Sequence, residues 1–316
     1  VSAYISNGQG HRLNTLYNPS MSEFIGLLIQ LHQQYPAATY GICLIFGLII
    51  GSFLNVVVHR LPIMLKQAWQ TEARLLLDQN EPVGQGSAKY NLVTPRSACP
   101  ACGQPISALH NIPVISYLLL KGRCRHCQAA ISLRYPLLEL TTGIATIIVI
   151  MLFGPTEKGL LACLLTYALI ALSQIDFETK LLPDDITLPM LWLGLIVNSS
   201  GIFTDLKSAL LGAVLGYLAL WTVYQGFRIA TGKEGMGFGD FKLLALLGAW
   251  LGWQALPFII LISSILGTLV GVTLILMGRD RNDAIPFGPY LAAAGWISLL
   301  WGDLILSRYL QVLNVS

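Results

Sequence analysis

The hydrophobic positions of this chain form long, nearly uninterrupted apolar runs that are separated by short polar stretches. A helix crosses the hydrocarbon core of a bilayer with about 20 apolar residues, so runs of this length predict membrane-spanning helices. Eight segments fit, the sixth of them short: 40–58, 135–153, 160–175, 186–203, 208–227, 241–253, 256–277 and 285–306. We therefore expect an all-α polytopic membrane protein with about eight transmembrane helices and the lipid bilayer as its surroundings.

Composition supports the same class of protein. Hydrophobic residues make up 54% of the chain and charged residues only 11%, with a mean hydropathy of +0.65. A soluble domain carries about 25% charged residues, so a soluble globular protein is excluded. Neither a G-x-G-x-x-G nor a Walker pattern indicates nucleotide binding, and we expect no nucleic-acid partner.

The basic residues are distributed unevenly among the polar stretches and predict the orientation. They concentrate in the long loop after the first span and in alternate loops from there on: Arg60, Lys66, Arg74, Lys89, Arg96, Lys121, Arg123, Arg125, Arg134, Lys180, Arg228, Lys233, Lys242, Arg279 and Arg281. The other side has only Arg12, Lys158, Lys207 and Arg308. Loops rich in Lys and Arg stay in the cytoplasm, so we expect the long loop in the cytoplasm and both termini outside.

Four regions follow from these patterns. Residues 1–20 are polar and aperiodic, and we interpret them as an upstream extension or an expression remnant, because Met21 opens a plausible natural start. Residues 21–60 form a short interfacial lead-in and the first span. Residues 61–134 form a cytoplasmic loop long enough to be a small domain, and residues 135–310 form the transmembrane core.

The long loop contains two C-x-x-C pairs, which predict a zinc-ribbon-like metal site. Two such knuckles supply four thiolates, which satisfy tetrahedral Zn²⁺ and leave no open position, so the metal would be structural. Disulfides are the alternative, but the cytoplasm is reducing. The expected ligands are Cys99, Cys102, Cys124 and Cys127.

Two aspartates stand at the ends of different apolar segments and are the candidate catalytic residues. Asp176 ends the third span, at the negative end of the helix dipole, where no capping rule explains a carboxylate. Asp240 follows the glycine-rich run Gly235–Gly239 at the start of the sixth span. The basic-residue pattern places both at the cytoplasmic face. Two nearby carboxyls can share one proton, which favours aspartyl hydrolysis.

Other polar residues near the membrane leave more than one interpretation open. Asn55 lies inside the first span, where an interhelical hydrogen bond or a direct functional role would explain it. Glu139 opens the second span, either facing water or buried against a cationic ligand group. Asp184 and Asp185 follow Pro183 at a helix start, where capping accounts for them.

The chain resembles the type IV prepilin peptidases, the bacterial leader peptidase/N-methyltransferase family, over residues of about 46–289. The resemblance rests on GSFLNV at 51–56 with Arg60-Leu61-Pro62, both C-x-x-C pairs, Arg134-Tyr135-Pro136 with Glu139, and two further motifs. These motifs are Ile175-Asp176 with Leu182-Pro183-Asp184, and Gly237-Phe238-Gly239-Asp240. Residues 1–20 lie outside it.

The resemblance implies an activity and partners that the residues alone do not give. It implies cleavage of the short basic leader of prepilins and pseudopilins after a glycine, at the cytoplasmic face of the bacterial inner membrane. It also implies methylation of the new N-terminal amine with S-adenosylmethionine, although no methyl-donor site is recognisable in the sequence. Asp176 and Asp240 match the family's catalytic pair. The acidic residues Asp176, Glu178, Asp184 and Asp185 could steer a basic leader, or could merely be solvated.

Two alternatives belong to other functional classes. A cation-coupled transporter would place acids near mid-span and contain inverted repeats, whereas these acids lie at helix ends and no repeat is visible. A zinc-ribbon membrane scaffold would bind a partner without catalysis. Loss of function on replacing Asp240 alone would argue against such a scaffold.

Overall fold

The structure is a computed structural model that describes residues 19–77, 90–107, 112–278, 280 and 285–312. The chain region expected as an extension, 1–20, lies almost wholly outside the described residues. Helices dominate, and the described part contains no strand, only two isolated β-bridges. The helices are α1 (Pro19–Gln34), α2 (Pro36–Leu76), α3 (Ile115–Leu119), α4 (Arg134–Phe153), α5 (Glu157–Thr179), α6 (Asp184–Ser199), α7 (Leu206–Thr231), α8 (Phe238–Leu251), α9 (Leu256–Leu276) and α10 (Gly288–Val312), with a 3-10 turn at Trp253–Ala255.

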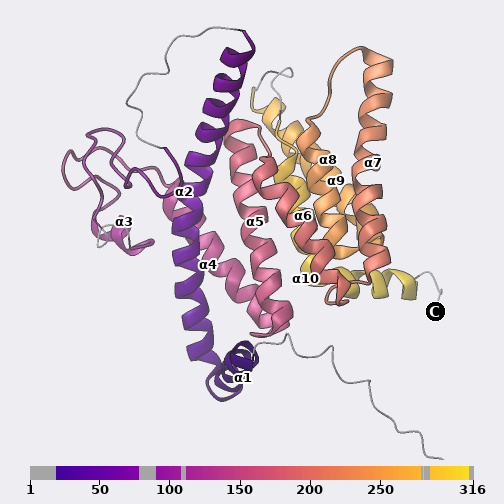
Figure 1. Cartoon of the computed structure of the whole chain (residues 1–316), viewed down its shortest axis with the longest axis horizontal. Coiled ribbons are helices and arrows are strands. Elements are labelled where there is room, and N and C mark those ends of the chain that lie inside the picture. The colour runs from indigo at the N-terminus through magenta and orange to yellow at the C-terminus, as the bar shows by residue number, and fades with distance from the viewer. Residues whose placement is uncertain (1–18, 78–89, 108–111, 279, 281–284, 313–316) are drawn as a thin grey trace, which may run out of the picture.

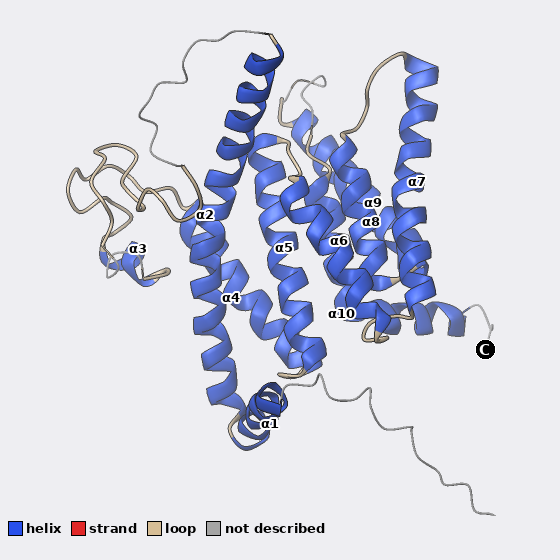
Figure 2. Cartoon of the chain, in the orientation of Figure 1, coloured by secondary structure: helices blue, strands red, loops and turns tan. Residues whose placement is uncertain are grey.

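The long helices run up and down beside one another (Figure 1). Helix α1 and the labelled C-terminal end lie at the lower side of the view, where α2 and α5 begin. At the upper side α5 ends and α6, α8 and α10 begin. The short α3 and the loops around it project beside α2, away from α7 to α10 (Figure 2). One end of the bundle therefore gathers the start or end of most core helices.

Five described helices are long and apolar enough to cross a membrane: α2, α4, α5, α7, and α9 together with its preceding turn. Each of the eight apolar runs falls on a helix, which confirms an all-α membrane protein. Helices α6 and α8, with 16 and 14 residues, are shorter than the about 20 residues that a full crossing needs. The number of eight complete spans stays a prediction.

Helix α2 extends further than the sequence pattern indicates. Its 41 residues continue through Pro62 to Leu76, so the first part of the region expected as a loop, residues 61–76, is helical. Leu61 and Pro62 are still buried, whereas residues 66–77 are exposed. The change in exposure indicates that α2 leaves the bundle and continues as a polar, solvated helix, which apolarity alone does not reveal.

The centre of the core is α8. Residues 243–250 are buried on every side of the helix, as are Asp240 and Phe241, and α8 packs against α6, α7 and α10. The indole of Trp250 donates to the Met190 carbonyl of α6 at 2.8 Å. Because α8 is surrounded by protein, its first turn is held at a fixed place in the bundle.

Small residues allow the closest helix contacts. A Cβ at Gly248 of α8 would lie 2.1 Å from the Gly212 carbonyl oxygen of α7, so neither glycine tolerates a side chain without separating the helices. Gly47 and Gly51 of α2 approach α4 in the same way, at Gly143 and Glu139. Small residues at these positions therefore allow α2 and α4 to pack closely.

Candidate active site and metal centre

Asp176 lies in the last turn of α5 and is almost completely buried, with 5% of its surface exposed. The helix ends four residues later, where Lys180 adopts the left-handed conformation and donates its N–H to the Asp176 carbonyl. A carboxylate is unfavourable at this end of a helix, where the unpaired carbonyl groups already carry partial negative charge. The position therefore needs a donor from outside the helix.

Gly288, at the start of α10, supplies that donor. Its backbone N–H donates to Asp176 Oδ2 at 2.9 Å. A Cβ at this glycine would lie only 2.6 Å from the same oxygen, so any other residue would displace the carboxyl group. The first turn of α10 thus fixes the orientation of Asp176.

Asp240 lies in the first turn of α8, with 7% of its surface exposed. The N-cap residue of α8 is Gly237, which has no side chain with which to cap the helix. The positive end of the helix dipole favours a carboxylate here, in contrast to the position of Asp176. The glycine-rich run Gly235–Gly239 leads into α8, and a Cβ at Gly239 would lie 2.7 Å from the Leu182 side chain.

The structure brings the two aspartates together. Asp240 and Asp176 are close enough to interact electrostatically although they belong to different helices. Leu182, in the connection between α5 and α6, fits against both Gly239 and Gly288. Three separate segments, the end of α5 and the starts of α8 and α10, therefore converge around two buried carboxyl groups.

The expected capping role of Asp184 and Asp185 is wrong. Pro183 occupies the N-cap position of α6, so both acids lie in the first helical turn, and no side-chain cap is present. Both carboxylate oxygens of Asp184 instead accept from Lys242 Nζ at 2.7 Å. This ion pair joins the first turn of α6 to α8, two residues after Asp240.

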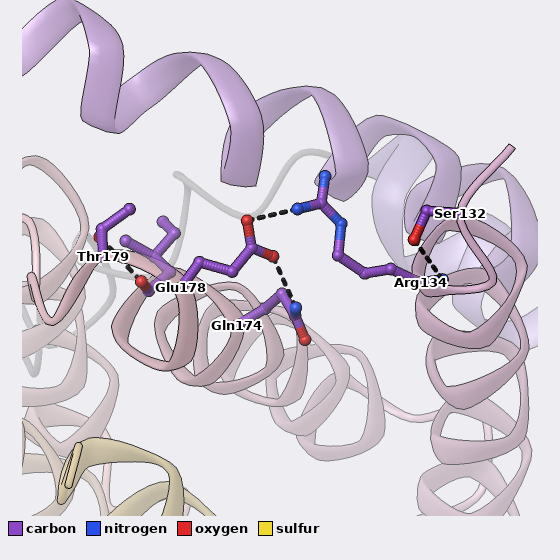
Figure 3. Close-up of polar contacts among 6 residues, drawn as sticks. Ser132, Arg134, Gln174, Glu178 and Thr179 are labelled. Carbon is purple, nitrogen blue, oxygen red and sulfur yellow. Dashed lines mark hydrogen bonds and ion pairs between the residues drawn. The ribbon is translucent and has the colours of Figure 1, made fainter. Parts of the chain in front are cut away.

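Glu178 is also neutralised by a partner. It forms an ion pair with Arg134 at the start of α4, and its other oxygen accepts from Gln174 at 2.6 Å (Figure 3). The Arg134 guanidinium lies 4.8 Å from the centre of the Tyr135 ring. Since Glu178 and Asp184 are both paired with cations of this chain, the acidic set offers less net charge for steering a basic leader than its sequence indicates.

The four cysteines of the C-x-x-C pairs form one cluster, and no other metal-binding group of this kind occurs within the described residues. Their sulfur atoms all lie within 4.8 Å of one another, and Cys99 Sγ is 3.8 Å from Cys127 Sγ. Zn–S bonds of about 2.3 Å in a tetrahedron separate the sulfurs by about 3.8 Å, so the cluster fits a metal ion. All four are free thiols.

Each knuckle is built as the same small turn. The N–H of the first cysteine bonds to a carbonyl five residues on, and its carbonyl accepts from the residue four positions on, in both pairs. That fourth residue, Gly103 or Gln128, has a positive φ. The backbone N–H groups of Cys127 and His126 lower the pKa of Cys124 to about 6, which favours the thiolate that metals bind.

Asn55 and Glu139 lie away from the aspartates, near the described residues between α2 and α4 that carry the four cysteines, here called the cysteine-rich segment. Asn55 Nδ2 donates to the Tyr135 carbonyl at 3.1 Å, which is the interhelical hydrogen bond expected of it. Glu139 is buried, with 8% exposed, and accepts from the Val114 N–H at 2.8 Å. The interpretation of Glu139 as a water-facing group is therefore wrong.

Sequence reasoning missed the residues that place the aspartates. Gly288 was only part of the last apolar run, and Leu182 was one apolar residue of a connection. The signal available was the run Pro286-Phe287-Gly288-Pro289, because glycine between prolines at a helix start indicates a close backbone contact.

The fold and the site define a class: a helical membrane protein with a buried aspartate pair at one end of its bundle and a four-cysteine cluster beside it. Two family models match the chain. The bacterial peptidase A24 N-terminal domain covers residues 45–153, and the type IV leader peptidase family covers residues 163–272. Asp176 and Asp240 lie in the second match, and all four clustered cysteines lie in the first.

Curated relatives are similar over nearly their whole lengths, and each is named prepilin leader peptidase/N-methyltransferase. The protein of Aeromonas salmonicida is 53% identical over 288 residues, covering 91% of this chain and 99% of that protein. The protein of Stutzerimonas stutzeri is 53% identical over 278 residues, which cover 87% of this chain and 95% of that protein. The protein of Pseudomonas aeruginosa is 52% identical over 285 residues, which cover 90% of this chain and 98% of that protein. No solved structure matches. The chain belongs to the prepilin leader peptidase/N-methyltransferase family.

Proposed function

We propose that this chain is a membrane aspartic peptidase that removes the basic leader of type IV prepilins and pseudopilins and then N-methylates the new terminus. The family membership supports this activity. The observation that carries the peptidase assignment is the convergence of Asp176 and Asp240, both buried and close enough to interact electrostatically. Neither alternative, transporter or scaffold, has a supporting feature in the described residues.

The chemistry follows from the proximity of the carboxyls. Two carboxylates in one buried site cannot easily both ionise, so the pair holds one proton between them. The ionised member removes a proton from water, which attacks the scissile carbonyl, while the protonated member donates a hydrogen bond to the carbonyl oxygen. The Gly288 N–H keeps the Asp176 carboxyl in place during this exchange.

We further propose that Cys99, Cys102, Cys124 and Cys127 hold a structural Zn²⁺. The sulfur separations support a tetrahedral metal, and four thiolates leave no position for a substrate. The metal would stabilise a segment that has little regular structure of its own.

The proposed location is the bacterial inner membrane, with residues 61–134 and the active site at the cytoplasmic face and both termini in the periplasm. The distribution of basic residues supports this orientation. The end of α5 and the starts of α6, α8 and α10 lie together at one end of the bundle, which agrees with a single face for the active site. We retain residues 135–310 as the peptidase core, because they contain both aspartates.

Incubation of the purified protein with a prepilin peptide and S-adenosylmethionine tests the proposal. Mass spectrometry should show loss of the leader followed by addition of one methyl group, because the acceptor amine exists only after cleavage. The Asp240→Asn protein should not cleave the prepilin peptide, but it should still methylate a peptide that is supplied already cleaved. A folded Asp240→Asn protein that fails to methylate that peptide would rule out separate sites.

A further inference from the structure

A cavity of about 830 Å³ lies between the cysteine-rich segment and the facing parts of α2 and α4. Its lining includes neither Asp176 nor Asp240, so it is separate from the aspartate pair. Sites for small molecules and cofactors typically have volumes of about 300–1,000 Å³. The cavity is therefore large enough for a cofactor-sized molecule.

The wall that α2 and α4 contribute to the cavity contains two buried acceptor side chains, Asn55 and Glu139. Asn55 is 7% exposed, and its amide nitrogen is used by the Tyr135 carbonyl. Its Oδ1 has no hydrogen-bond partner among the described residues, although the atom is fully buried. A buried polar atom without a partner costs about 1–3 kcal/mol, so this oxygen is suited to accept a hydrogen bond from a ligand.

Glu139 adds a negative charge to the same cavity. One oxygen accepts from the Val114 N–H, and the Ser52 hydroxyl is a further hydrogen-bond partner, but no ion pair to Glu139 occurs in the described part of the chain. Arg60, Arg96 and Arg125 also line the cavity, and Arg60 donates to the carbonyls of Asn91 and Pro95 at 2.8 and 2.6 Å. A buried carboxylate next to an unused acceptor favours a ligand that brings positive charge and N–H donors.

The backbone beside Glu139 supports a binding role. Val114 has a φ of 59°, a conformation that is strained for a β-branched residue. Strain of this kind persists where the surroundings impose it, and it is concentrated at ligand and active sites. Here it directs the Val114 N–H at the carboxylate. Tyr90, Tyr117 and Tyr135 line the cavity, and arginines lie over the rings of Tyr90 and Tyr135.

We propose that this cavity binds S-adenosylmethionine, with the buried side chains of Asn55 and Glu139 facing its cationic part. The inference rests on the proposed methyltransferase function, which requires a cationic methyl donor with an aromatic base. The donor's positive charge complements Glu139, its amino group can donate to Asn55 Oδ1, and its adenine can stack on a tyrosine ring.

The transfer is balanced without another reactant. The lone pair of the new N-terminal amine forms a bond to the methyl carbon, and the carbon–sulfur bond breaks with its electron pair staying on sulfur. The products are a methylated ammonium, which loses a proton to water, and a neutral thioether. The donor's positive charge is thus present before transfer and lost from sulfur afterwards.

Binding of S-adenosylmethionine and of S-adenosylhomocysteine to the full chain in detergent, measured by calorimetry, tests the site. Glu139→Gln should weaken binding of the charged donor by about 10- to 100-fold, because it removes one partner of a buried charge pair. Binding of the homocysteine product, which lacks the sulfonium charge, should weaken far less. Asn55→Ala should weaken both compounds. Glu157→Gln, an exposed acid at the start of α5, is the matched control.

The outcomes separate this inference from the proposed function. If the wild-type chain neither cleaves prepilin nor methylates a cleaved peptide, the proposed function fails. If the wild type methylates but Glu139→Gln and Asn55→Ala both bind the two compounds with wild-type affinity, the cavity assignment is overturned. A Glu139→Gln variant with a raised KM for the peptide and unchanged donor affinity would overturn it as well, because the carboxylate would then face the acceptor amine.

Discussion

Asp176 is held by a residue 112 positions away in the chain, and this contact explains why the start of α10 is glycine. A carboxyl group at the end of an apolar helix can point to lipid, water or protein. The Gly288 N–H selects one orientation, and the missing side chain leaves the space that the carboxyl occupies. Leu182 fills the remaining volume between Gly288 and Gly239.

Gly288→Ala should therefore impair cleavage without removing either aspartate. The new Cβ would lie 2.6 Å from Asp176 Oδ2, so the carboxyl must move. A misplacement of about 1 Å at a catalytic group can reduce the rate about 10²-fold. The measurement is kcat for a prepilin peptide. Gly226→Ala is the matched control, because nothing lies within 4 Å of its Cβ, and an equal loss in both variants would refute the account.

Some residues of the candidate site could be predicted from the sequence, and others could not. Asp176 and Asp240 were predicted because charges at the ends of apolar helices are costly and few. Their proximity in the structure agrees with the predicted pair, whose catalytic role stays a prediction. Gly288 could not be assigned, because its importance lies in a distance to another helix. The sequence could not decide between an exposed and a buried Glu139 for the same reason: its partner Val114 comes from the cysteine-rich segment.

At the scale of elements, α8 decides where Asp240 lies. The helix is only 14 residues long, about 21 Å at 1.5 Å per residue, and it is enclosed by α6, α7 and α10. Its apolar sequence predicted a helix but not that the helix would be internal. The sequence also did not predict that the exposed end of α2, residues 66–76, is helical, because its polar positions resemble those of a loop.

Gly248→Ala tests the close packing of α7 on α8. The added Cβ would meet the Gly212 carbonyl oxygen at 2.1 Å, and overpacking of this kind typically costs about 1–3 kcal/mol. The melting temperature in detergent should fall, and cleavage should fall with it because α8 carries Asp240. Gly226→Ala, which changes a glycine of α7 with no neighbour within 4 Å of its Cβ, should leave the melting temperature unchanged. Equal melting temperatures for Gly248→Ala and the wild type would contradict the packing.

We propose that a metal ion, in place of a hydrophobic core, stabilises the cysteine-rich segment. Protein purified without chelator should contain about one Zn²⁺ per chain, and Cys102→Ser should lower that content. Structural zinc contributes on the order of 10–16 kcal/mol to the folding of small domains, so removal should also make this segment sensitive to protease. Cys43→Ser, within α2, should retain the metal. Less than half an equivalent in the wild type would count against the site.

At the scale of the whole molecule, one end of the bundle carries both proposed chemistries. The aspartate pair lies among the α5, α8 and α10 ends, and the cavity with Glu139 lies between α2, α4 and the cysteine-rich segment. The Arg134–Glu178 ion pair joins these two regions, since it ties the start of α4 to the end of α5 (Figure 3). Cleavage and methylation can then follow one another without the product crossing the membrane.

Thiol labelling in intact cells tests the orientation. Leu76→Cys, at the exposed end of α2, should resist a membrane-impermeant reagent, because we place that end in the cytoplasm. Ser200→Cys, in the exposed connection after α6, lies at the opposite end of the bundle and should react readily. Reversed labelling of the two variants would overturn the orientation.

The aspartate pair is tested most directly by single-turnover cleavage of a prepilin peptide across pH. Asp176→Asn and Asp240→Asn should each reduce the rate by several orders of magnitude, since acid–base groups contribute about 10²–10⁴-fold each and act as a unit. Asp184→Asn should be mild, because it removes only a surface ion pair to Lys242 worth at most about 1 kcal/mol. The wild-type profile should be bell-shaped, falling at low pH when both carboxyls are protonated and at high pH when both are ionised. Near-normal cleavage by Asp176→Asn together with loss in Asp184→Asn would contradict the pair.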